Sequence, residues 1–155
     1  MTIENWKYDD FVKANNGQFS ALDFIHAVTA KVALPPDFAL CMARLFAPTM
    51  TMFDNVIVVA EWFDEARYRK YRRSGMKPEQ AQAWVNMVEL TDIFQGISFG
   101  QAQQFAAIIT ELWNGKLSQN FPNSAAKASA FFEEDSGEVF VTIGSFCEAS
   151  ADGKA

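Results

Sequence analysis

The chain has 155 residues, a length typical of one ordinary domain. Half of the residues are hydrophobic, among them fifteen Phe and four Trp, so enough apolar surface is available for a substantial core. Thirteen basic residues stand against nineteen acidic ones, and the formal net charge of −6 disfavours general binding to nucleic acid or to anionic membranes. We expect a single globular domain over residues 1–149 and a disordered tail at 150–155.

The N-terminus and the apolar runs indicate a soluble, cytoplasmic protein. The opening MTIENWKYDD is acidic and polar, whereas a secretory signal begins with basic residues followed by an apolar stretch. The longest strongly apolar run, residues 56–60, is far shorter than the roughly 20 residues that span a bilayer. Cys41 and Cys147 lie in apolar surroundings, which favours buried thiols in a reducing compartment over a disulfide.

Three helices are expected in the first third of the chain. Residues 4–15 carry apolar side chains at helical spacing and stop at an Asn-Gly pair. Ser20 followed by Asp23 resembles a capping box and predicts a helix from residue 21 to about 32. Pro36 suits the first turn of the next helix, which should end before Pro48.

The middle of the chain predicts a strand and then a short basic helix. Residues 55–63 are rich in β-branched and aromatic side chains, which favours a strand, although a buried helix stays open. Asp64 is a typical N-cap, and Ser74-Gly75 is a typical helix end.

A further helix is expected over residues 79–94, with Pro78 at its first turn. In this helix Trp84 belongs to an apolar face, whereas Gln82 and Asn86 belong to the opposite, polar face.

The last third predicts a helix and a β-hairpin. Ser98 with Gln101 forms a second capping-box pattern, and the helix behind it should fray near Asn114-Gly115. Residues 134–137 then separate two strand-like segments, 125–133 and 138–148. The whole pattern indicates an α+β fold with about five or six helices packed on a small antiparallel sheet that ends in a C-terminal β-hairpin.

Residue types for catalysis are scarce. His26 is the only histidine, so sites that require two imidazoles are excluded, and its apolar helix favours a partly buried structural role. The sequence shows neither a Gly-x-Ser-x-Gly turn nor a phosphate-binding glycine loop. We therefore expect no catalytic residue, no metal and no cofactor, and a binding protein is favoured over an enzyme.

Two charged clusters are candidate binding surfaces. On the predicted basic helix, two tyrosines can pack inward while the basic cluster projects to solvent; this cluster consists of Arg67, Arg69, Lys70, Arg72 and Arg73. It is interpreted as a solvated or ion-paired face, with protein docking or nucleic-acid binding as alternatives. The acidic hairpin tip is either a solvated turn or a site for a cation or a basic protein; it consists of Glu133, Glu134, Asp135 and Glu138.

The most specific functional hypothesis is a non-enzymatic, acidic protein-binding domain, such as a bacterial immunity or antitoxin-like inhibitor of a basic toxin. One alternative is an enzyme or small-molecule-binding domain with a pocket between the sheet and helix 79–94, formed by Glu61, Trp84, Asn86 and Glu89. Another is a nucleic-acid accessory factor that uses residues 67–73. Homo-oligomerisation stays open.

Overall fold

The computed structural model describes residues 3–146, with the exception of the side chain of Glu4. The chain divides into two compact units, residues 1–42 and residues 43–155, and each is described by itself. The expected single domain over residues 1–149 stays a prediction. Cys147 and the expected tail at 150–155 lie outside the described residues.

The first unit is helical, as predicted. It contains a short 3-10 helix (Ile3–Asn5), α1 (Tyr8–Ala14), α2 (Ala21–Thr29) and the first part of α3 (Pro36–Phe46). The capping box at α2 is confirmed, because Ser20 and Asp23 each bind the backbone N–H of the other. Helix α2 ends at residue 29, three residues before the predicted end.

Side chains of the first unit remain accessible to solvent. The unit is held by ring contacts such as Phe11 on Phe24, whose centroids lie 5.4 Å apart, but none of its described residues is buried. The predictions of a buried Cys41 and a partly buried His26 were therefore wrong, since both are exposed. A few short helices do not enclose a core, so apolar neighbours in the sequence do not bury these two side chains.

Residues 43–146 of the second unit form two antiparallel sheets. Strands β1 (Met50–Phe53) and β2 (Val56–Val59) form a hairpin, whose two turn residues, Asp54 and Asn55, have positive φ angles of 48° and 62°. The strand predicted at 55–63 is confirmed in its first part, whereas β1 was missed. The other sheet has the order β3-β5-β4 and contains the predicted C-terminal hairpin. Its strands are β3 (Val88–Glu89), β4 (Ala128–Glu133) and β5 (Glu138–Ile143).

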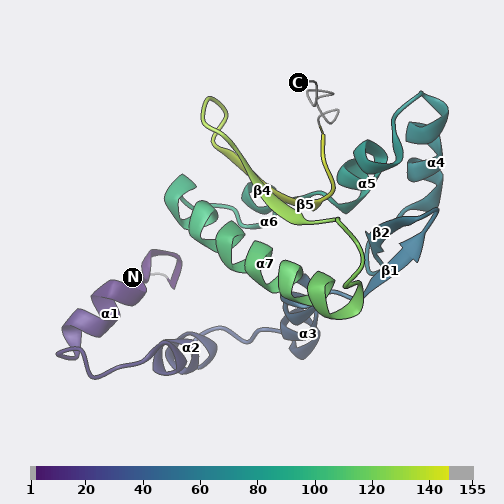
Figure 1. The fold of residues 1–155 in the computed structure, drawn as a ribbon. Coiled ribbons are helices and arrows are strands. Elements are labelled where there is room, and N and C mark those ends of the chain that lie inside the picture. Colours follow the sequence, from purple (N-terminus) through teal and green to yellow (C-terminus); the bar gives the residue numbers. More distant parts are fainter. Residues whose placement is uncertain (1–2, 147–155) are drawn as a thin grey trace, which may run out of the picture. The chain divides into compact units, whose positions relative to one another are not determined.

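Among the described residues, four complete helices and the last turn of α3 accompany these sheets in the second unit. The complete helices are α4 (Glu65–Arg73), α5 (Pro78–Asn86), α6 (Leu90–Ile93) and α7 (Phe99–Asn120). Helix α7 packs along the β4–β5 hairpin, and α5 packs on both β5 and β2 (Figure 1). The predicted caps at Asp64 and Ser98 are confirmed. The fold is α+β, as the sequence predicted.

The predicted helix 79–94 was wrong beyond Asn86. The chain becomes extended at Met87 and enters β3 before α6 begins. The predicted faces were also wrong, because Gln82 and Asn86 are only 3% and 1% exposed, whereas Trp84 is 38% exposed. The physical reason is that α5 lies against strand edges. Side-chain amides can hydrogen-bond to the open backbone N–H and C=O groups there, whereas an indole has no acceptor and can only donate.

Asn86 joins α5 to both sheets through hydrogen bonds. Its Oδ1 accepts the N–H of Val59 at 2.9 Å, and its Nδ2 donates to the carbonyl of Ile57 at 2.8 Å and to that of Ile143 at 3.4 Å. Gln82 Nε2 donates to the same Ile57 carbonyl at 3.0 Å. The two amides therefore satisfy the edge of β2 that β1 leaves open.

Helix α7 continues past the predicted fraying point at Asn114-Gly115 and reaches Asn120. The Asn114 side chain binds both backbone groups of Ala128, while Trp113 and Leu117 are buried in the core. Tertiary contacts on both sides of the glycine thus outweigh its low helix propensity.

Replacing Asn86 with Ala is expected to lower the free energy of unfolding by roughly 3 kcal/mol. The substitution leaves the Val59 N–H and the Ile143 carbonyl without this partner in a buried position, and each unmet group costs about 1–3 kcal/mol. Urea unfolding followed by tryptophan fluorescence measures the loss. The matched control is Asn120→Ala at the exposed end of α7, which should change stability by less than about 0.5 kcal/mol.

Two glycine-to-alanine substitutions should act in opposite directions. At Gly144, φ is 118° and a Cβ would lie 2.8 Å from the Glu79 carbonyl oxygen, so Gly144→Ala should destabilise by roughly 3 kcal/mol. At Gly115, inside α7, a Cβ meets open space, so Gly115→Ala should stabilise by about 0.5–1 kcal/mol. Thermal unfolding gives both signs, and equal effects at the two positions would contradict the packing described here.

Candidate functional site

Helix α4 is fixed to the second unit by its tyrosines. Tyr68 is 1% exposed, its ring packs edge-on against Phe53, and its hydroxyl donates a hydrogen bond to Asp54 Oδ2 at 3.0 Å. Tyr71 is half-buried on the same side of the helix. The prediction that two tyrosines pack inward is confirmed, and the basic side chains are exposed.

Two members of the basic cluster are paired within the chain. Arg69 forms an ion pair with Glu65 at 2.6 Å, and its guanidinium lies 5.4 Å from the ring centroid of Phe53. Arg72 donates to the carbonyl of Met76 at 2.5 Å and lies 3.9 Å from a carboxylate oxygen of Asp54. The charges of these two arginines are therefore partly neutralised by Glu65 of α4 and by Asp54 of the β1–β2 turn.

The other three cations follow at three-residue spacing along α4. Arg67 lies over the Tyr71 ring, with 5.6 Å to the centroid, and its Nε donates to the Tyr71 hydroxyl at 2.8 Å. Lys70 and Arg73 are exposed and form no ion pair with any described residue. We call Arg67, Lys70 and Arg73 the basic face; it carries charge that no described carboxylate neutralises within 4 Å.

A continuous row of aromatic rings begins at this basic face. Ring centroids are 6.4 Å apart between Tyr71 and Trp84, 5.1 Å between Trp84 and Phe146, and 4.9 Å between Phe146 and Phe131. Phe131 lies on the face of the sheet that meets α5, because its opposite residue in the register is Phe140 and the next such pair includes Thr142, which bonds Ala83 of α5. We call these four residues the aromatic row.

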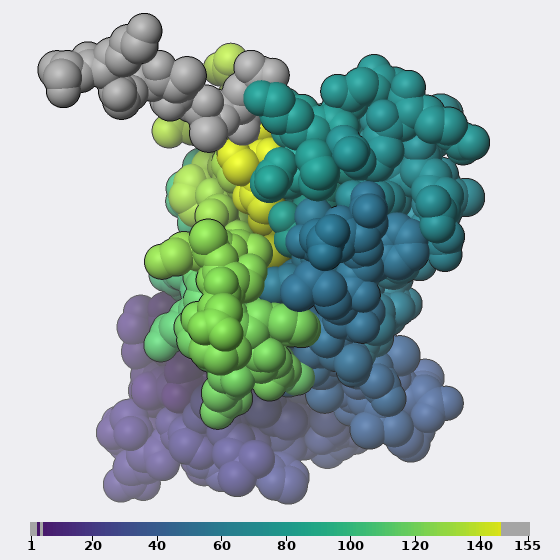
Figure 2. Space-filling view, turned by 45° about the vertical axis from the view of Figure 1, so that its right-hand side comes forward, coloured from purple at the N-terminus to yellow at the C-terminus, as the bar shows by residue number. Residues whose placement is uncertain are grey.

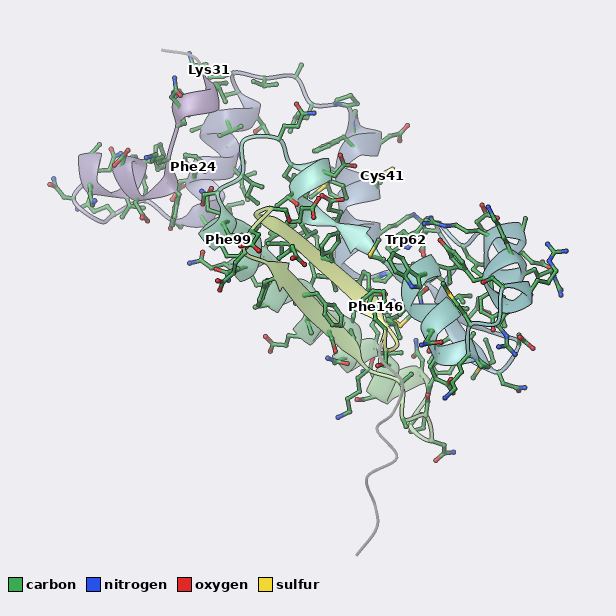
Figure 3. The ribbon with its side chains drawn as sticks, turned by 90° about the horizontal axis from the view of Figure 1, so that it is seen from above. Phe24, Lys31, Cys41, Trp62, Phe99 and Phe146 are labelled. Atoms are coloured by element: carbon green, nitrogen blue, oxygen red, sulfur yellow. The ribbon has the colours of Figure 1, made fainter. Side chains whose placement is uncertain are left out.

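The aromatic row is partly open to solvent. Trp84 and Phe131 are 38% and 37% exposed, and the two rings between and beside them are half-buried. Phe146 lies just after the C-terminal end of β5 (Figure 3), where its ring contacts Trp84 of α5. Four rings in successive contact, two of them more than a third exposed, form a preorganised apolar contact area.

A groove of about 550 Å³ borders the row at Phe131. Figure 2 shows this hollow between the light-green segment that precedes β4 and the blue β1–β2 hairpin, with the yellow end of β5 between them. Its walls come from β2, α5, β4, the β1–β2 turn and the segments before β4 and after β5. They include Asn55, Ile57, Glu79, Gln82, Lys127, Ser129 and Ser145. The groove combines backbone, amide, hydroxyl and charged groups with apolar ones.

The four residues predicted to form a pocket do not line this groove. Trp84 belongs to the aromatic row, and Asn86 hydrogen-bonds to backbone groups at strand edges. Glu89 in β3 accepts a hydrogen bond from Thr91 at 3.3 Å. Partial burial by itself raises the pKa of Glu61, but hydrogen bonds from Thr49 and Arg44 outweigh it and hold that pKa below its usual value. Ligand binding by this set stays a prediction.

The acidic hairpin tip carries an unfavourable pair. Glu133 lies directly opposite Glu138 in the β4–β5 register, and like charges in this position destabilise a hairpin. Ser136 donates a hydrogen bond to Glu138 at 2.8 Å, whereas Glu134 and Asp135 are exposed. Next to the tip, Phe132 is 47% exposed.

Within residues 3–146, no group of three or more His, Cys, Asp and Glu side chains is arranged to hold a metal ion. In the same range no helix is both long enough and apolar enough to cross a membrane.

Sequence reasoning found the two charged clusters but missed the aromatic row. The four rings come from four separate segments and span residues 71–146, so no local spacing brings them together. Helical periodicity placed Trp84 on an apolar helix face, and it was also named as a residue of a possible pocket. The sequence offered one signal, the position of Trp84 between Gln82 and Asn86, but that these two amides are buried is known only from the structure.

Tyr68 makes the stability of the protein sensitive to alkaline pH. Burial, followed by the hydrogen bond to Asp54, raises the pKa of Tyr68 from 10.0 to about 12. The folded protein then holds this proton more tightly than the unfolded chain, so the free energy of unfolding should be retained below pH 10 and should fall between pH 10 and about 12.

Urea unfolding at several pH values measures this fall, and absorbance at 295 nm follows the late-titrating phenol. Tyr68→Phe removes the titrating group and should abolish both the late absorbance step and its contribution to the pH slope. An unchanged slope in Tyr68→Phe would assign the alkaline instability to other groups.

Comparisons with known proteins do not name a family. No protein-family model matches the chain, and neither curated proteins nor solved structures gave a significant match. The basic face, the aromatic row and the acidic hairpin tip are therefore interpreted from their own geometry.

Proposed function

We propose that this chain is a protein-binding domain and that it contacts its partner through the aromatic row. The observation that carries the proposal is the unbroken contact of four rings with Trp84 and Phe131 left more than a third exposed. Aromatic residues and arginine dominate the binding energy of protein interfaces, and Arg67 stacks on the end of this row. The rings already touch in the free protein, so little side-chain entropy is lost when a partner covers them.

The basic face indicates which partner surface suits this contact. Arg67, Lys70 and Arg73 lack carboxylate partners among the described residues, whereas Arg69 and Arg72 have them. An acidic segment of a partner would be attracted to the three free cations and would gain apolar contact along the row. A nucleic acid is less favoured, because a net charge of −6 repels the phosphates beyond the basic face.

The acidic hairpin tip supports a second candidate, the immunity or antitoxin-like inhibitor of a basic toxin. Glu133 and Glu138 oppose each other, so a cationic partner would relieve their repulsion. Phe131 and Phe132 would provide apolar anchors beside that charge. The two candidates share the end of the aromatic row and differ in the charge of the partner.

Binding experiments with four variants test these proposals. The immobilised protein captures partners from nuclease-treated extract of its source cells, and affinities are then measured with the purified partner. Trp84→Ala should weaken binding about 30-fold, which corresponds to about 2 kcal/mol, because a central tryptophan is lost. The matched control is Ile108→Ala, which removes a half-exposed apolar side chain from α7, away from the row, and should leave affinity unchanged.

Two charge variants decide between the partners. Arg67→Gln combined with Lys70→Gln and Arg73→Gln should slow association and weaken its salt dependence if the partner is acidic. Glu134→Gln combined with Asp135→Gln should do so if the partner is basic. The protein-binding proposal fails if Trp84→Ala binds as well as Ile108→Ala, or if nuclease treatment removes the captured material.

A further inference from the structure

Strand β4 is an edge strand, and its outward backbone groups can be identified. The N–H of Val139 in β5 donates to Thr91 Oγ1 at 3.3 Å and thus points away from β4. Val139 lies opposite Phe132. Phe132 and Val139 therefore form a non-hydrogen-bonded antiparallel pair, in which both residues direct their N–H and C=O groups away from one another. By alternation along the strand, the outward groups of β4 belong to Ala128, Ala130 and Phe132.

One of these three positions is already closed. The side chain of Asn114 accepts the N–H of Ala128 at 2.9 Å and donates to its carbonyl at 3.0 Å, in the manner of a neighbouring strand. Ala130 and Phe132 have no such partner among the described residues. Ala130 and Phe132 therefore leave two backbone N–H groups and two carbonyl groups open at the edge of β4, beside the exposed rings of Phe131 and Phe132.

We propose that a second copy of this chain pairs with these open residues, so that two β4 strands run antiparallel about a two-fold axis at Phe131. In this register Ala130 of one copy lies opposite Phe132 of the other. Each such pair exchanges two N–H···O bonds, and the symmetry gives two pairs, hence about four bonds. Asn114 stops the ladder at Ala128 in both copies, which limits the contact to a closed dimer of short strands.

The charges fit this register. Positions related by the axis sum to the same value, so Glu133 of one copy lies opposite Ser129 of the other and diagonal to Lys127, which comes one residue before β4. The acidic hairpin tip, whose Glu133 and Glu138 repel each other, thus receives a cation from the second copy. Lys127 is exposed and forms no ion pair with any described residue, so it is available for this contact.

The rings fit it as well. Phe131 of each copy meets its equivalent at the axis, in the close-spaced type of cross-strand pair that favours aromatic contact. Because Phe131 ends the aromatic row, the two rows would join into one strip with a basic face at each end. The dimer goes beyond the proposed function and does not depend on it, since it is measured without any partner.

Sedimentation equilibrium of the full chain, over concentrations from micromolar to millimolar, tests the dimer. The wild type should dimerise weakly, and Lys127→Glu or Glu133→Lys should each weaken dimerisation by about 10-fold, because each places like charges at both symmetry-related contacts. An equimolar mixture of the two variants should recover wild-type affinity, since both contacts in the mixed dimer then pair opposite charges. Circular dichroism confirms that each variant is folded.

Ala130→Pro gives a second, backbone-directed test. Proline removes the outward N–H and blocks the partner strand, and it is tolerated at positions of an edge strand that donate no bond inside the sheet. Dimerisation should be lost in Ala130→Pro. The matched control is Ala125→Pro, which lies before β4 and should dimerise as the wild type does. A wild type that stays monomeric at millimolar concentration, or a mixture of charge variants that does not recover, would overturn the proposal.

Discussion

The second unit depends on the buried side-chain amide of Asn86. Strand β2 pairs with β1 on one edge only, and its other edge points into the interior, where unpaired backbone groups are costly. Asn86 and Gln82 on α5 meet the carbonyl of Ile57, and Asn86 also meets the N–H of Val59. The same Asn86 nitrogen reaches Ile143 of the second sheet, so one residue ties two sheets that share no strand.

This constraint also explains where the accessible surface lies. The amide face of α5 is turned inward, so Trp84 on the same helix is directed outward, where it joins Tyr71 and Phe146. The close approach of α5 to the end of β5 requires Gly144, where a side chain would meet the backbone of α5. The aromatic row therefore exists because the polar side of the helix has been taken by strand edges.

Local signals in the sequence were sufficient for helix ends and for the hairpin. The side-chain caps at Ser20, Asp64 and Ser98 form as predicted, since a cap depends only on residues within one turn. The faces predicted for the helix at 79–94 were wrong, because periodicity cannot distinguish an amide that faces solvent from one that faces a strand edge. The aromatic row was not predicted, because its contacts join segments that are far apart in the chain.

Three side-chain carboxamides satisfy backbone groups at the edges of strands in this fold. Asn86 with Gln82 closes β2 in the interior, and Asn114 closes β4 at Ala128 near the end of the hairpin. Beyond Ala128 no side chain continues this protection, and the strand there carries exposed phenylalanines and not the lysines or prolines that usually guard an edge. A protein that satisfies the edge of β2 and the start of β4 with side-chain amides, and leaves the rest of β4 apolar and open, has a surface better suited to contact than to solvent.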